Sequence, residues 1–234
     1  MKISKFIALS AIFVAAFSFV SCSSDDDDDD NKNDVVADNH EYVDLGLPSG
    51  TLWATCNVGA SKPEDFGDYF AWGETKTKET FAFENYKWYN ANVYTKYCIH
   101  SDEGPIDNKT ILDSEDDAAT ANWGSKWCMP LLKQVEELFN GENTTQKWTA
   151  LNGVNGLLMT SKKNGNTIFF PATGMRIDGS LEDEDNTCAY WSRSLQNPES
   201  SFAAFGFFFY PNASILGGYS RRTGFAVRPV RSSK

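Results

Sequence analysis

The sequence predicts an α+β fold, a single domain with two short helices, small antiparallel sheets and high loop content. Three observations support this prediction. Only two segments of the 234 residues show helical periodicity. Several strand-like segments are separated by turns that are rich in glycine, asparagine and aspartate. Hydrophobic residues make up 41% of the chain, which is enough to pack a core, and no internal repeat is present.

The clearer of the two helices follows Pro130. The apolar side chains of Leu131–Phe139 recur at the spacing of one helical face, so this segment is expected to pack against the core. A second, shorter helix is expected to begin at Ser114 or Asp116 and to run through Ala121. Acidic residues in its first turn would complement the helix dipole.

Four segments later in the chain have the pattern of strands. Leu157–Ser161 and Thr167–Phe170 flank the turn residues Lys163–Asn166, which predicts a hairpin. Ala203–Tyr210 lacks polar alternation, and we expect a strand that is covered on both faces. Gly224–Arg231 is expected to form the last strand, with its arginines pointing outward.

The first residues have the features of a secretory signal peptide. Two lysines precede the apolar run Phe6–Val20, which is too short to cross a bilayer comfortably, although a short membrane anchor is the alternative. The sequence Phe-Val-Ser-Cys that ends at Cys22 resembles the lipobox of bacterial lipoproteins. We therefore expect a signal peptide at 1–21 and lipid attachment at Cys22.

A polar and strongly acidic segment follows the cysteine. It resembles the surface-export signal of Bacteroidota lipoproteins and consists of Ser23, Ser24, Asp25, Asp26, Asp27, Asp28, Asp29 and Asp30. With the residues after it, it forms a tether at 22–40 that has too little apolar surface to fold. The folded domain is then expected at 41–232. The resemblance implies a lipid-anchored protein of the outer membrane that faces the cell exterior, with no contact to the membrane other than its anchor.

Composition and motifs exclude several classes of function. The chain has 21 basic and 32 acidic residues, a net charge of -11, which argues against binding to nucleic acid. It contains no phosphate-binding loop, no dinucleotide-binding glycine motif and no nucleophile elbow. The acidic groups Glu115–Asp117 and Glu182–Asp185 are expected to be solvated surface and not a catalytic carboxylate pair. The sequence therefore predicts a protein that is not an enzyme.

The cysteines and histidines do not have metal-ligand spacing. Besides Cys22 the chain has four cysteines, Cys56, Cys98, Cys128 and Cys188, and no two of them form a Cys-x-x-Cys pair. Only two histidines are present, His40 and His100, and we expect no metal and no cofactor. In an exported protein the four cysteines allow three disulfide pairings, and four buried free thiols are the alternative.

Long motifs give the domain a family resemblance. Residues 41–231 resemble the Fibrobacter succinogenes major paralogous domain family, on the following segments: Tyr42–Ala60, Gly67–Thr75, Asp116–Ala119, Trp123-Gly124, Trp127–Pro130, Tyr190–Ser194 and Gly224–Val230. The family is related to the formylglycine-generating-enzyme-like branch of the C-type-lectin-like fold. The resemblance implies small twisted sheets, two helices, and N- and C-terminal strands that lie close together.

The chain departs from this pattern where catalysis would be expected. Cys128 stands where the family usually has Arg, and Leu131 stands where it has Thr. Formylglycine-generating enzymes need a pair of active cysteines near the C-terminus, whereas here the last cysteine, Cys188, is single. No catalytic residue of that branch can therefore be assigned to a position of this chain.

The most aromatic segment, Tyr86–Tyr97, is the best candidate for ligand binding. Flat rings can stack on the C–H faces of sugars, and aromatic side chains dominate protein contact sites. The candidate ligand-binding residues are Tyr86, Trp88, Tyr89 and Tyr94. The alternative is that these rings fill a loop-rich core, as Phe202–Tyr210 is expected to do.

Three hypotheses about function follow. The preferred one is a surface lipoprotein whose domain is a non-catalytic binding or structural module, with a glycan or a surface protein as ligand. The second is an oxidoreductase of the formylglycine-generating type, or a degenerate enzyme, which requires two thiols in one pocket. The third is a structural subunit of a surface appendage, which requires an exposed edge strand.

Overall fold

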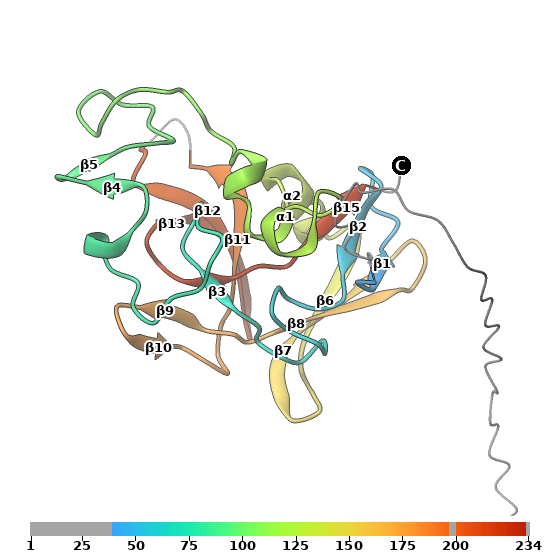
Figure 1. Cartoon of the computed structure of the whole chain (residues 1–234). Coiled ribbons are helices and arrows are strands. Elements are labelled where there is room, and N and C mark those ends of the chain that lie inside the picture. Colours follow the sequence, from blue (N-terminus) through green and yellow to red (C-terminus); the bar gives the residue numbers. More distant parts are fainter. Residues whose placement is uncertain (1–38, 197–199, 233–234) are drawn as a thin grey trace, which may run out of the picture. The chain divides into compact units, whose positions relative to one another are not determined.

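Residues 39–196 and 200–232 are described by a computed structural model of the chain (Figure 1). They form small sheets, two α-helices and long loops, so the predicted α+β class is confirmed. The helices are α1 (Ala118–Trp123) and α2 (Leu132–Phe139), and two short 3-10 helices are η1 (Phe83–Asn85) and η2 (Ser114–Asp116). The strands are β1 (Tyr42–Asp44), β2 (Thr51–Ala54), β3 (Tyr69–Phe70), β4 (Tyr89–Asn90), β5 (Val93–Tyr94), β6 (Thr144–Leu151), β7 (Val154–Ser161), β8 (Thr167–Pro171), β9 (Met175–Ile177), β10 (Ser180–Glu182), β11 (Cys188–Leu195), β12 (Ala203–Tyr210), β13 (Ala213–Ser220), β14 (Phe225–Ala226) and β15 (Val230–Ser232).

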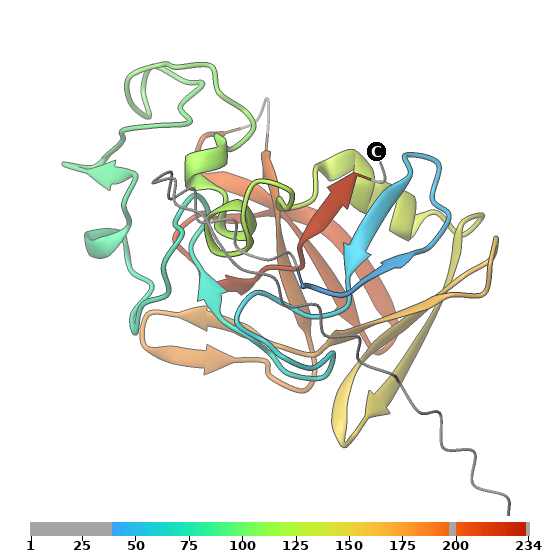
Figure 2. The same cartoon turned by 45° about the vertical axis from the view of Figure 1, so that its right-hand side comes forward.

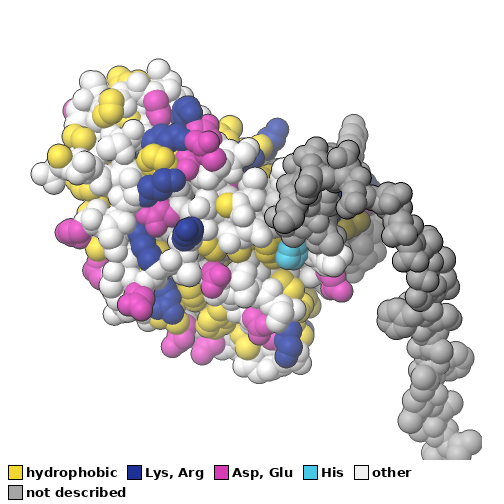
Figure 3. Space-filling view, viewed as in Figure 1, with side chains coloured by type: hydrophobic (Ala, Val, Ile, Leu, Met, Phe, Trp, Pro, Cys, Tyr) yellow, Lys and Arg dark blue, Asp and Glu magenta, His cyan; other side chains and the backbone are white. Residues whose placement is uncertain are grey.

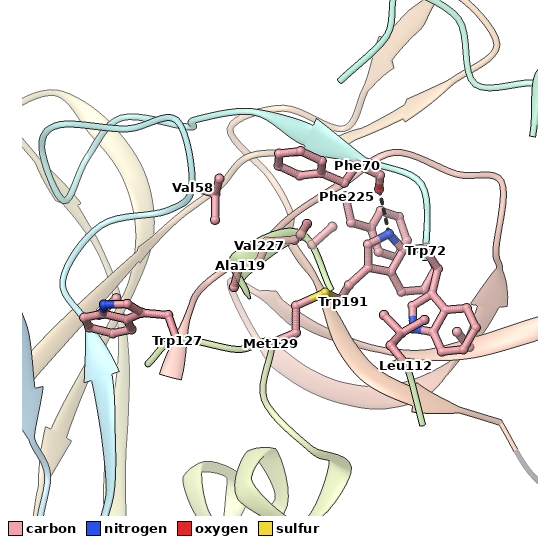
Figure 4. Close-up of a cluster of buried hydrophobic side chains, with 14 of the residues drawn as sticks. Val58, Phe70, Trp72, Leu112, Ala119, Trp127, Met129, Trp191, Phe225 and Val227 are labelled. Atoms are coloured by element: carbon pink, nitrogen blue, oxygen red, sulfur yellow. Dashed lines mark hydrogen bonds between the residues drawn. The ribbon is translucent and has the colours of Figure 1, made fainter. Parts of the chain in front are cut away.

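The main sheet has five strands in the order β13-β12-β11-β14-β3. All neighbouring pairs are antiparallel except β11 and β14, which are parallel. A cluster of buried side chains that includes Trp72, Trp127, Trp191 and Phe225 packs around this sheet (Figure 4). The indole N–H of Trp191 donates a hydrogen bond to the carbonyl oxygen of Phe70 over 2.8 Å. Trp72, Trp123 and Trp127, which stand next to a glycine or a cysteine in the sequence, are all buried in this cluster.

The first and last strands belong to one small sheet. Its order is β1-β2-β15, and both β1 and β15 pair antiparallel with β2 (Figure 2). Val230 of β15 lies opposite Trp53 of β2, and both side chains are fully buried. The expectation that the terminal strands lie close together is thus met.

The predicted hairpin is confirmed. Strands β7 and β8 pair antiparallel, with Thr160 opposite Thr167, and β6 completes a three-stranded sheet in the order β6-β7-β8. Gly165 adopts a φ of 76° in the connecting turn, a left-handed conformation that glycine adopts without strain. Apolar side chains from this sheet pack with those of β11 and β12 in a second buried cluster.

Both predicted helices are present, with shifted bounds. Helix α2 covers the predicted segment, and its buried residues are Val135 and Leu138. The earlier segment starts as η2 and becomes α1 only after Asp117, whose side chain accepts a hydrogen bond from the Thr120 N–H and so caps the helix. The acidic residues therefore lie before α1 and not in its first turn.

The expected single strand with outward arginines is wrong for Arg228. The strand ends at Ala226, and residues 227–229 instead run beside residues 54–58, where the carbonyl oxygen of Val227 accepts from the Val58 N–H. Arg228 is fully buried, and its Nε donates to the Asn57 side chain over 2.7 Å. Alternate side chains point to opposite faces of a sheet only within one continuous strand. Because the chain leaves the strand after Ala226, this alternation does not predict the direction of the Arg228 side chain.

Several predictions concern residues outside the described part of the chain. These are the signal peptide at 1–21, the lipid attachment at Cys22 and the acidic run Ser23–Asp30. In the described residues 39–196 and 200–232, no helix is long and apolar enough to cross a membrane. His40, placed by the sequence at the end of the tether, stacks on Trp123 with ring centres 3.7 Å apart.

Candidate ligand-binding site

The aromatic candidate segment Tyr86–Tyr97 directly follows η1 and contains the two-residue strands β4 and β5. Tyr89 pairs with Tyr94 and Asn90 with Val93, which forms a tight hairpin. Its two turn residues, Ala91 and Asn92, have φ values of 48° and 65°, as a type I′ turn requires. Figure 3 shows hydrophobic side chains at the upper left, over the end of the molecule that carries β4, β5 and the loop after them.

Two of the four candidate residues lie in the core. Tyr86 and Tyr94 are 2% and 4% exposed. The Tyr86 hydroxyl donates to the Trp72 carbonyl oxygen over 2.7 Å and accepts from Arg221 Nε over 3.0 Å. Burial raises the pKa of Tyr86 above its ordinary value, with Arg221 opposing the shift. Both tyrosines therefore support the hairpin from within.

Arg221 is the centre of that support. Its side chain is fully buried, and its guanidinium carbon lies 4.5 Å from the ring centre of Tyr94. Its two terminal nitrogens donate to three backbone carbonyl oxygens, those of Lys96, Tyr97 and Ser201, over 3.0 to 3.2 Å. The guanidinium thus joins the end of β5 to the loop before β12. No sequence pattern predicted this role, because Arg221 is 124 residues from Tyr97.

Trp88 is half-buried and already has several partners. Its indole N–H donates to the Gly73 carbonyl oxygen over 2.9 Å. The ammonium groups of Lys87 and Lys96 lie 4.2 and 5.0 Å from its ring centre, as in cation–π contacts. These contacts orient the ring and reduce the area that is open to a ligand.

Tyr89 is the candidate that lines an open cleft. A shallow cleft of about 340 Å³ is bounded by six residues: Phe83, Glu84, Tyr89, Asn90, Ala91 and Asn92. The rings of Tyr89 and Phe83 have centres 4.8 Å apart, and the ring of Phe202 lies 5.9 Å from that of Phe83. Phe202 is 45% exposed, so its expected place in the core is wrong, because it lies in the loop before β12 begins. We call Phe83, Tyr89 and Phe202 the aromatic surface.

The acidic residues near α1 are not the solvated surface that was expected. Asp116 is 2% exposed, and its carboxylate contacts Lys87 Nζ at 2.9 Å, Lys96 Nζ at 2.6 Å and the Tyr97 hydroxyl at 2.6 Å. Burial opposes its ionisation, but these three donors hold the pKa of Asp116 below its ordinary value. Only Glu115, whose side chain is 77% exposed, matches the expectation.

Asp113, Glu115 and Asp116 bring one carboxylate oxygen each within 4.8 Å of one another, a spacing that could suit a cation. Lys96 already provides the positive charge. Its ammonium lies 2.7 Å from Asp113, 3.2 Å from Glu115 and 2.6 Å from Asp116. The cluster is therefore an internal ion-pair network that ties the end of the hairpin to η2.

Asp117 is fully buried, and its expected exposure is also wrong. Besides capping α1, its carboxylate accepts from the Met129 N–H over 2.9 Å. Arg193 Nε lies 3.7 Å from the same carboxylate. This one side chain therefore fixes both the start of α1 and the segment that leads to α2. The other acidic run, Glu182–Asp185, is exposed as expected.

The four described cysteines are free thiols. Cys98 belongs to a buried cluster with Tyr86 and Tyr94, whereas Cys188 belongs to the cluster formed by the β7–β8 sheet and the main sheet. The two thiols therefore do not share one cluster. Burial raises the pKa of the Cys188 thiol, which lowers its reactivity as a nucleophile.

Comparisons with protein-family models, with curated proteins and with solved structures found no match to this chain. A function can therefore be inferred only from the residues and contacts described above.

Proposed function

We propose that this protein is an outer-membrane lipoprotein that is exposed at the cell surface and carries a non-catalytic binding module. Cys22 would hold the lipid, and Ser23–Asp30 would direct the protein to the outer face. The module would belong to the Fibrobacter succinogenes major paralogous domain family and have the C-type-lectin-like fold that this resemblance implies. Its ligand would be a glycan or a surface protein.

The observation that carries this proposal is the aromatic surface. The rings of Phe83, Tyr89 and Phe202 lie next to one another at the end of the domain that carries β4 and β5. The hairpin beneath them is held by Arg221 and by the Lys96 ion pairs. Because the rings sit on a rigid support, a ligand would not need to order them on binding, which lowers the entropic cost of binding.

The binding role can be tested with the full-length protein in detergent, on a glycan array and in an adhesion assay with intact cells. Tyr89→Ala and Phe83→Ala should reduce binding, because each removes a ring from the aromatic surface. Tyr42→Ala is a matched control, since Tyr42 is 49% exposed but lies on β1. Binding that is equal in all four proteins, or absent from all, would reject the aromatic surface as the site.

The localisation can be tested separately. Replacing Asp25–Asp30 with asparagine while keeping Cys22 should leave the protein lipidated but protected from protease added to intact cells. Cys22→Ala should prevent lipid labelling altogether. If the asparagine variant is still cleaved on intact cells, the acidic run has no export role.

The two alternatives differ in what supports them. The oxidoreductase hypothesis needs two thiols in one pocket, and the placement of Cys98 and Cys188 in separate clusters removes its basis for that pair. The appendage hypothesis needs an exposed edge strand, and β6 and β13 are eight-residue strands at the edges of their sheets. Light scattering after size-exclusion chromatography tests it, since an appendage subunit would form assemblies larger than a monomer.

A further inference from the structure

A second cleft lies on a different part of the domain, between the β6–β7 sheet and the hairpin of β12 and β13. Its volume is about 590 Å³, within the range of small-molecule sites. It is lined by Phe139, Gly141, Thr144, Gln146, Trp148, Leu157, Tyr210, Pro211, Asn212, Ala213 and Ser214. We call it the edge-strand groove, because β6 and β13 are both edge strands.

The groove is formed by parts of the chain that are far apart in sequence. The Ser214 hydroxyl donates to the side-chain oxygen of Gln146 over 2.5 Å, which joins the edges of β13 and β6. Phe139 stacks on the buried Phe209, with ring centres 5.2 Å apart, and closes the end next to α2. Trp148 packs partly against the second buried cluster. The walls are therefore fixed by packing and by a side-chain hydrogen bond.

The chemistry of the lining is neutral. None of these eleven described residues is charged, although charged residues make up 23% of the chain. A groove without charge favours a ligand without charge, since an ionic ligand would lose its hydration and gain no ion pair. The aromatic side chains Phe139, Trp148 and Tyr210 provide flat apolar faces, and the amides of Gln146 and Asn212 provide hydrogen-bonding groups.

Several of these polar groups are not used by the protein itself. In the described part of the chain, the Trp148 indole N–H, the Tyr210 hydroxyl and the Asn212 side-chain amide have no protein hydrogen-bond partner. All three residues line the same groove. Ring faces together with neutral donors and acceptors match a molecule with C–H faces and many hydroxyl groups.

We propose that the edge-strand groove binds a neutral oligosaccharide. A sugar ring would stack on Trp148, and its hydroxyl groups would bond to the free groups of Asn212 and Tyr210. This site is separate from the aromatic surface and does not depend on it. The two can be told apart because no residue lines both clefts.

The test uses the full-length protein in detergent and five neutral probes: cellohexaose, xylohexaose, laminarihexaose, maltohexaose and mannohexaose. Isothermal titration calorimetry should detect binding of at least one probe. Asn212→Ala and Trp148→Ala should each weaken that binding by about tenfold or more, which corresponds to ~1.4 kcal/mol. Asn212 is exposed, so its variant should fold normally, and Trp148→Phe should retain part of the affinity because it keeps a ring.

Two matched controls define specificity. Ile215→Ala changes an exposed residue on the same strand that does not line the groove, and Tyr42→Ala changes an exposed ring on β1 that lines neither cleft. Both should bind the probe as the unchanged protein does. The proposal is overturned if none of the five probes binds, or if Asn212→Ala binds as tightly as the unchanged protein. It is also overturned if light scattering shows a dimer that Trp148→Ala dissociates, since the groove would then hold a second copy of the chain.

Discussion

Replacing Arg221 with methionine should destabilise the domain strongly. Methionine has a similar length but donates no hydrogen bond. It would leave the carbonyl oxygens of Lys96, Tyr97 and Ser201 without the donor that they share in the folded protein. It would also remove the cation–π contacts with the surrounding aromatic rings, among them that of Tyr94.

The size of the effect follows from these contacts. A buried acceptor that loses its donor costs about 1–3 kcal/mol. Arg221→Met leaves three such carbonyl oxygens without a donor, and we take the lower part of that range for each of them. The apolar side chain that replaces the guanidinium offsets part of this cost. The expected loss in the free energy of unfolding is therefore about 3–5 kcal/mol. For a domain of this size the midpoint of thermal unfolding should fall by about 10 °C.

The assay is thermal and urea unfolding of the full-length protein, followed by circular dichroism. Arg222→Met is the matched control, because Arg222 is the next residue, is 21% exposed and pairs with the exposed Asp178. We expect its effect to stay near 1 kcal/mol, as for partly exposed ion pairs. Equal unfolding midpoints for the two variants would refute the assignment of Arg221 as the support of the hairpin.

Three further predictions concern the buried polar and thiol groups. Asp117→Ala should reduce the free energy of unfolding by about 2–4 kcal/mol in urea, since it removes a helix cap and the acceptor of a buried N–H; a loss below 1 kcal/mol would contradict this. The pKa of Asp116 is lower in the folded than in the unfolded state, so its stabilisation is present above pH ~4 and is lost as the pH falls further. Asp116→Asn should therefore flatten the decline of the thermal midpoint below pH ~4, and Glu115→Gln should not. Cys188 should react with a thiol reagent only at the rate of global unfolding, whereas the half-buried Cys56 should react first; the reverse order would show that β11 opens locally.

The elements that depend on local pattern could be predicted. The stripe of apolar residues located α2, and the turn around Gly165 located the β7–β8 hairpin, because both signals lie within a few residues. The aromatic segment stays a prediction as a ligand site, and one of its rings, that of Tyr89, lines an open cleft. Its division into buried and exposed rings could not be predicted, because it depends on Arg221, which reaches the segment from the other end of the chain.

The edge-strand groove lay beyond sequence reasoning for the same reason. Trp148 and Tyr210 are 62 residues apart and belong to different strands, and each alone has the pattern of an ordinary sheet residue. Likewise, Phe83 and Phe202 are 119 residues apart in the sequence and meet only after folding.

The amino-acid sequence alone is sufficient to predict the α+β class, the two helices and the hairpin. These properties follow from composition and from short-range periodicity. Which charged side chains are buried and which rings are exposed depends instead on long-range tertiary contacts. Asp116, Asp117, Arg221 and Arg228 have the residue types of a solvated surface, yet each is buried. Their burial is tolerated because partners, most of them from distant segments, satisfy most of their polar atoms, and no local pattern predicts those long-range contacts.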